Sequence, residues 1–280
     1  MPIPFIEIPN GDKGTAKTLV EFLNLSGQWH EGHDIEGSGA LSQLWYRGVS
    51  QKYDKLLPGI YRDDFTERAK ALLGESELEE KRLRLERETV SQFRTGGAQF
   101  LRSHSLTEIY FVAQHYGLPT RLLDWSTNPL AALFFACDGN DGNDGFVYAM
   151  DARKVLPKGK NLTNSRKLYQ SVMTMRHPHV TYAVEVSFWG EVKKDHQPYV
   201  LPVRPDHIPG RIGQQSSCFT LHMHNAESVK NDTLIAIRID GASKDKIRRE
   251  LLKVNINHFT VYNDLDHLSK EIVKGWAIRQ

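Results

Sequence analysis

The stretch Ala113–Ala136, AQHYGLPTRLLDWSTNPLAALFFA, predicts a helix, a tight turn, a strand and a second helix in immediate succession. Apolar side chains at helical spacing lead into it, and Gly117 with Pro119 is typical of a helix C-terminus. Asn128 before Pro129 is typical of a helix N-terminus, and the following LAALFFA is hydrophobic all round, which predicts a buried helix. Polar side chains therefore gather where strand meets helix, a junction whose backbone N–H groups favour an anion.

The charge balance argues against nucleic-acid binding that depends on bulk charge. The chain has 280 residues, of which 36 are basic and 34 acidic, so its formal net charge is only +2. A local basic groove stays compatible with this balance. A hydrophobic content of 40% is enough to build a full core.

Cysteine usage and hydropathy indicate the compartment. Cys137 and Cys218 lie far apart with no CxxC pair, which argues against a disulfide framework and a cysteine zinc site. The sequence starts without a signal-peptide pattern, and no window approaches the roughly 20 apolar residues of a membrane span. We therefore expect a soluble cytoplasmic protein without a membrane partner.

The order of the predicted elements favours an α+β fold with a mostly antiparallel sheet. Helices dominate early, including one long charged helix, and strands dominate late. Residues 1–39 are interpreted as an N-terminal extension and residues 40–280 as a single globular domain. The expected helices cover residues 15–25, 65–94, 244–252 and 264–272, with a weak helix around 166–175, and the expected strands include 146–151, 181–188, 199–203, 217–223 and 233–240.

Tyr46-Arg47-Gly48 closes a predicted strand. An arginine at a strand end, before a glycine that permits close approach, suits a phosphate or carboxylate ligand. The alternative is a surface arginine before a turn glycine.

The central stretch supplies further candidates, each with a structural alternative. His115, at a helix end beside Gln114 and Tyr116, is either an acid–base group or a cap of its own helix. Arg121 and Asp124 form either a ligand site or a structural ion pair, in which Asp124 braces Arg121 or Arg47.

Short polar runs flank two strands. Ser126, Thr127 and Asn128 are all good helix caps, and capping explains one of the three, which leaves hydroxyls for a ligand. Gln214 and Gln215 precede a strand and offer uncharged amides. A metal is not expected, because His222 and His224 lack an identifiable third ligand. Glycine-rich phosphate loops, GxSxG and HExxH are absent from the sequence.

Taken together, several stretches resemble the FRG domain family. They are LWYRGVS, LLPGIYR, AQHYGLPTRLLDWSTNPLAALFFA, RIGQQSSCFTLH and NDLDHLSKEI, which span roughly residues 40 to 272. The Phe-Arg-Gly motif that names the family here reads Tyr46-Arg47-Gly48. Ser216 and Ser217 stand where the family tends to place a glycine.

The order of these parts is also similar to that of the ADP-ribosyltransferases, which use NAD as a substrate on a split, mostly antiparallel sheet. This resemblance implies that Arg47 binds NAD, that Ser126 and Thr127 line the nicotinamide pocket, and that Gln215 occupies the place of a catalytic glutamate. The residues it implies for binding the dinucleotide are Tyr46, Gly48, His115, Tyr116, Arg121, Asp124, Asn128 and Gln214.

Because that glutamate is missing, the sequence fits two classes of function. The first is an ADP-ribosyltransferase acting on a protein or nucleic-acid acceptor, as a bacterial toxin or phage-defence effector with an antitoxin or defence-system partner. The second is a non-catalytic module that binds a nucleotide or nucleic acid. A third function class is a nuclease or other hydrolase that uses His115 and Asp124. Asp124 and Glu108 are the carboxylates nearest to the expected site.

Overall fold

The computed structural model describes residues 14–31, 44–52, 55–74, 76–139, 142–155, 172–189, 199–205, 217–223, 229, 234–262 and 264–277. Within them, the helices are α1 (Leu19–Glu31), α2 (Asp63–Leu73), α3 (Leu78–Gly96), α4 (Ala98–Leu101), α5 (Leu106–His115), α6 (Pro129–Cys137), α7 (Pro178–Trp189), α8 (Lys244–Lys253), α9 (His258–Tyr262) and α10 (Leu265–Ala277). The strands are β1 (Thr15–Ala16), β2 (Leu44–Val49), β3 (Leu122–Ser126), β4 (Gly145–Asp151), β5 (Met173–Thr174), β6 (Tyr199–Arg204), β7 (Ser217–Met223) and β8 (Leu234–Ile239).

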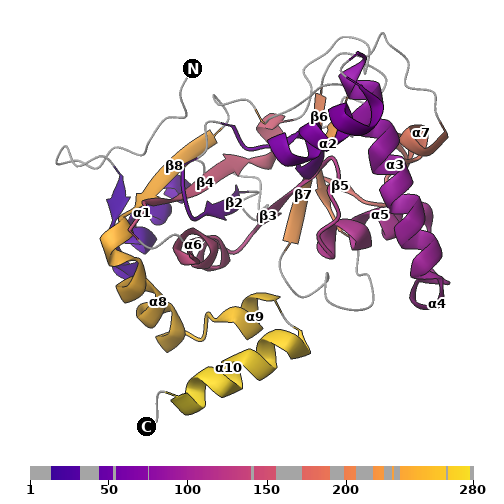
Figure 1. The fold of residues 1–280 in the computed structure, drawn as a ribbon. Coiled ribbons are helices and arrows are strands. Elements are labelled where there is room, and N and C mark those ends of the chain that lie inside the picture. Colours follow the sequence, from indigo (N-terminus) through magenta and orange to yellow (C-terminus); the bar gives the residue numbers. More distant parts are fainter. Residues whose placement is uncertain are drawn as a thin grey trace.

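These strands form one mixed sheet in the order β1-β8-β4-β2-β3-β7-β6-β5 (Figure 1). Only the outermost pairs, β1 with β8 and β5 with β6, are parallel, and the inner five pairs are antiparallel. The prediction of an α+β fold with a mostly antiparallel sheet is therefore confirmed.

The sheet is split near its centre, between β2 and β3. These two strands share a single paired position, Tyr46 with Ser126, whereas β2 pairs with β4 at six positions. Beyond that pair the strands diverge, and the guanidinium of Arg47 reaches across. Its Nη1 donates a 2.7 Å hydrogen bond to the carbonyl oxygen of Asp124. A side chain thus satisfies a carbonyl that a continuing ladder would have used.

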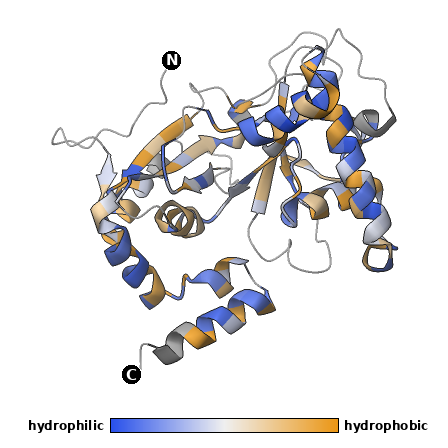
Figure 2. Ribbon diagram, viewed as in Figure 1, coloured by the Kyte–Doolittle hydropathy of each residue, from blue (hydrophilic) through white to orange (hydrophobic). Residues whose placement is uncertain are grey.

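Helices cover each half of the sheet separately. The cluster around α1, α6, α8 and α9 packs on β2, β4 and β8, whereas the cluster around α3, α5 and α7 packs on β5, β6 and β7 (Figure 1). A third cluster, which includes Trp45, Leu123 and Trp125, lies on the opposite face and spans both halves. The helices differ in hydropathy, because α6 is almost entirely apolar whereas α8 and α10 mix polar and apolar residues (Figure 2).

The central stretch folds as its capping residues predict. Leu118 N donates to Ala113 O and Gly117 N donates to Gln114 O, the pattern of a Schellman motif that ends α5. Gly117 has φ of 85°, a conformation that favours glycine. At the start of α6 the Asn128 side chain accepts from Leu130 N at 2.9 Å.

Gly48 allows α6 to lie directly on β2. A Cβ built at Gly48 would stand 1.7 Å from Ala132 O and 2.8 Å from Ala136 N. Gly145, on the neighbouring strand, meets Ala136 O at 2.2 Å in the same way. The glycine of the Tyr-Arg-Gly motif therefore serves the packing of backbone against backbone.

Three predicted elements differ from the structure. The described end of the weak helix expected around 166–175 contains strand β5, Met173–Thr174. Residues 181–188 are expected as a strand but belong to helix α7. Pro178 occupies the first turn of this helix, and Val180, Ala183 and Val184 bury one helical face. The long helix expected over 65–94 is two helices, α2 and α3, which separate at Gly74 with φ of 86°.

Within the described residues, none of the helices combines the length and the hydropathy that a membrane span requires.

We predict that Gly48→Ala lowers the free energy of unfolding by at least about 3 kcal/mol, because its methyl group would force α6 away from β2. Chemical denaturation measures this loss. Gly27→Ala in α1 is the matched control, since nothing lies within 4 Å of its added Cβ and alanine favours a helix by about 1 kcal/mol. Equal stability of the two variants would contradict the packing role of Gly48.

Candidate functional site

A pocket of about 360 Å³ opens where β2 and β3 diverge. We call it the split pocket. It is lined by residues of β2 and β3, of the end of α5, of α6, of β7 and of α9. The residues that line it are Tyr46, Arg47, Gly48, Gln114, His115, Asp124, Trp125, Ser126, Ala131, Ala132, Phe135, Ser217, Val261 and Tyr262. Its volume lies in the range of small-molecule sites.

Several residues predicted from the sequence meet in this pocket. Arg47 and Ser126 share it, although they are 79 positions apart in the printed sequence, and His115 and Asp124 line the same cavity. Ser217 also lines the pocket and pairs with Ser126 in the sheet. The strand that follows the paired glutamines therefore enters the site, while Gln214 and Gln215 themselves lie outside the described residues.

The carboxylate of Asp124 is held by a relay of side chains. Gln114 Nε2 donates to Asp124 Oδ2 at 2.7 Å, and Thr120 Oγ1 donates to Gln114 Oε1 at 2.6 Å. Leu122 N in turn donates to Thr120 Oγ1 at 3.0 Å. Asp124 thus presents an oriented negative charge at the pocket, and its side chain braces neither of the two arginines considered from the sequence.

Tyr262 contributes to the site in a way that the sequence did not indicate. It comes from α9, and its ring stacks on His267 with centroids 4.0 Å apart. Burial raises the pKa of Tyr262, and the nearby Asp138 and Asp264 add to this effect. The hydroxyl therefore stays a neutral hydrogen-bond donor.

Three aromatic side chains of the matched stretches differ in whether they line the pocket. Tyr46 and Trp125 line the pocket but are only 2% and 3% exposed, and burial raises the pKa of Tyr46 to about 12. Tyr116 does not line the pocket and contacts His115 and Phe93 instead. Two hydroxyl and amide candidates also lie outside its lining: Thr127, beside Cys218, and Asn128, which caps α6.

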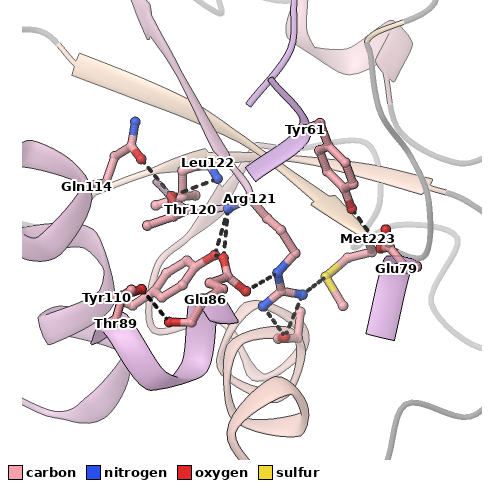
Figure 3. A network of polar contacts seen from close by, with 11 residues as sticks. Tyr61, Glu79, Glu86, Thr89, Tyr110, Gln114, Thr120, Arg121, Leu122 and Met223 are labelled. Atoms are coloured by element: carbon pink, nitrogen blue, oxygen red, sulfur yellow. Dashed lines mark hydrogen bonds and ion pairs between the residues drawn. The ribbon is translucent and has the colours of Figure 1, made fainter. Parts of the chain in front are cut away.

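Arg121 does not reach the split pocket, because it is buried in a separate network (Figure 3). Its Nε pairs with Glu86 Oε2 at 2.9 Å, and its backbone N donates to Glu86 Oε1 at 2.8 Å. Tyr110 donates its hydroxyl to the same carboxylate, and Arg121 also contacts the carbonyl of Ala183. Burial alone would lower the pKa of Arg121, but Glu86 raises it above its usual value.

Two other groups considered from the sequence have structural roles. Glu108 forms the capping box of α5 with Ser105 and pairs with Arg176, away from the split pocket. His222 is buried in β7, where its ring nitrogen lies 2.9 Å from Thr220 Oγ1. His224 lies outside the described residues.

One cluster in the described part of the chain has the composition of a metal site. Ligand atoms of Asp264, Asp266 and His267 lie within 4.8 Å of one another. Asp264 accepts from the backbone N of His267 at the start of α10, and Asp266 pairs with Lys270 at 2.6 Å. Capping and helix pairing account for this arrangement.

Residues 42–145 match the model of the FRG domain, so the chain carries an FRG domain over this segment. The segment includes β2, the loop after it, and the whole central stretch. Among curated proteins and among solved structures, none matches the chain. The likeness to ADP-ribosyltransferases therefore stays a prediction from the order of the motifs.

We predict that the Arg121–Glu86 pair is a structural tie between the sheet and α3. Arg121→Met or Glu86→Leu alone should cost about 3–5 kcal/mol of stability, because each leaves a buried charge or donor without its partner. The double variant should lose clearly less than the sum of the two. Denaturant unfolding of all three tests this, with Arg84→Ala on the exposed face of α3 as the control. Additive losses would contradict the coupling.

Proposed function

We propose that the protein is an NAD-consuming ADP-ribosyltransferase whose split pocket receives the nicotinamide riboside end of the dinucleotide. The observation that carries the proposal is the meeting of Arg47, Ser126 and Ser217 around one cavity at the divergence of β2 and β3. The three residues come from adjacent strands of the sheet, β2, β3 and β7. The FRG domain match locates two of these strands but names no activity.

Side chains of the split pocket can supply the groups that ADP-ribosyl transfer from NAD requires. The bond between nicotinamide and C1′ of the ribose breaks, nicotinamide leaves with the electron pair, and positive charge develops on the ribose. An acceptor nucleophile then bonds to C1′ and gives its proton to a base, for which the pocket offers His115. Arg47 supplies a guanidinium for the pyrophosphate, and the Ser126 hydroxyl lies beside the place proposed for the ribose.

Asp124 is the carboxylate that we assign to the developing positive charge. It lines the split pocket, and the amide of Gln114 fixes its orientation. A preorganised negative charge of this kind stabilises an oxocarbenium-like transition state without reorganisation. Asp124 would take the role of the catalytic glutamate, in whose place this sequence has Gln215.

A non-catalytic nucleotide-binding module is the second candidate. It is favoured by the fact that Asp124 is the single carboxylate in the described lining of the split pocket, and its charge is already shared with an amide donor. This module would hold a nucleotide or a nucleic-acid end without breaking a bond. Only the first candidate implies a macromolecular acceptor, a role as a toxin or defence effector, and an antitoxin or defence-system partner.

We predict that Arg47→Ala lowers kcat/KM for nicotinamide release from NAD by about 10²–10³-fold, because the pocket loses its phosphate-binding guanidinium. Arg47→Lys should recover only part, since an ammonium cannot make the paired hydrogen bonds. Labelled NAD with cell lysate measures release and transfer together. Arg84→Ala, exposed on α3, is the control. Equal release by wild type and Arg47→Ala would overturn the transferase.

Asp124→Asn separates the two candidate functions. The variant keeps the shape of the side chain but removes its charge, so a transferase should keep its affinity for NAD and lose turnover by about 10²-fold or more. Calorimetry gives the affinity, and single-turnover assays give the rate. NAD binding by the wild type without turnover would support the binding module instead.

A further inference from the structure

A second pocket lies against the split pocket and shares Arg47, Gly48 and Phe135 with it. Its volume is about 440 Å³, and we call it the loop pocket because the segment after β2 forms much of its wall. That segment runs from Lys55 to Asp63, at the start of α2. Arg47 therefore stands on the boundary between two adjoining cavities.

The loop that forms this pocket is firmly attached to the central stretch. Ile60 N donates to Thr120 O at 3.3 Å, and a Cβ built at Gly59 would lie 2.8 Å from Pro119 Cα. Within the loop, Arg62 Nε donates to Leu57 O at 3.2 Å. The pocket wall is thus built on the turn that precedes β3.

The lining combines three kinds of chemistry. Lys55 and Arg62, together with the shared Arg47, offer cationic donors to an anion. Asp63 and Asp138 offer carboxylates, which accept hydrogen bonds from hydroxyl or amino groups.

An apolar wall completes the loop pocket. Leu56, Leu57 and Phe135 are its largest apolar lining residues. Such a wall suits the flat face of a base. Phosphate, ribose hydroxyls and a base are the three parts of a nucleotide, and the lining provides a matching partner for each.

We propose that the loop pocket binds the adenosine diphosphate half of the dinucleotide. The nicotinamide end would then occupy the split pocket, and Arg47, on the shared wall, would contact the pyrophosphate that joins the two halves. This inference rests on the proposed function, which decides that the nicotinamide end of the dinucleotide lies in the split pocket. It extends the proposed site to the loop from Lys55 to Asp63, which is not among the motifs that resemble those of the ADP-ribosyltransferases.

The test is calorimetric titration of the full chain with ADP and, separately, with nicotinamide mononucleotide. Lys55→Ala and Arg62→Ala should each weaken ADP binding by about tenfold or more, because each removes a charged donor, and should leave nicotinamide mononucleotide binding unchanged. Ser126→Ala should show the reverse pattern. Arg68→Ala, an exposed position on α2 outside the pocket lining, is the matched control.

The outcomes separate this inference from the proposed function. ADP binding that is absent at millimolar concentration, or unaffected in both variants, overturns the inference even if NAD is consumed. ADP binding that weakens as expected, in a protein that does not release nicotinamide from NAD, sustains the nucleotide pocket and overturns the transferase. Melting temperatures of Lys55→Ala and Arg62→Ala show whether either variant has lost its fold. Both variants are expected to stay folded, because Lys55 lies outside any helix and the Arg62 side chain does not cap α2. Weakened binding of short oligonucleotides, with ADP unaffected, would assign the basic groups to a nucleic-acid acceptor and overturn the inference.

Discussion

The contact between the backbone of α6 and Gly48 of β2 is the constraint on which the site depends. Because no side chain separates them, the carbonyl of Ala132 reaches the strand directly. The first turn of α6 then lies over the point where β2 and β3 part, and Phe135 falls on the boundary between the two pockets. A bulkier residue in place of Gly48 would lift the helix and remove a wall from both cavities at once.

Two arginines, Arg121 and Arg47, illustrate how burial separates different structural roles. Arg121 is 1% exposed, and its guanidinium donates hydrogen bonds to Glu86 and to a backbone carbonyl. It therefore joins the sheet to the helices on one side. Arg47 is half-buried, bridges to the Asp124 carbonyl and lines two cavities. The first arrangement ties the sheet to its helices, whereas the second leaves a positive charge at the wall of two cavities.

The candidate site extends beyond the segment that matches the FRG domain. Residues 42–145 supply Arg47, Asp124 and Ser126, but Ser217 and Tyr262 complete the split pocket from later parts of the chain. Asp124 is oriented within the matched segment, by a side-chain amide on α5. The proposed chemistry therefore depends on a charge held by local contacts and on walls brought in from elsewhere.

The sequence by itself determined the local structure of the central stretch, because Gly117, Asn128 and Pro129 act through contacts with their immediate neighbours. It also indicated the fold class and most of the strands. The tertiary structure alone decided that Arg121 pairs with Glu86 and that Tyr262 borders the site. These outcomes depend on which distant segments pack together, and side-chain spacing along the chain carries no information about such partners.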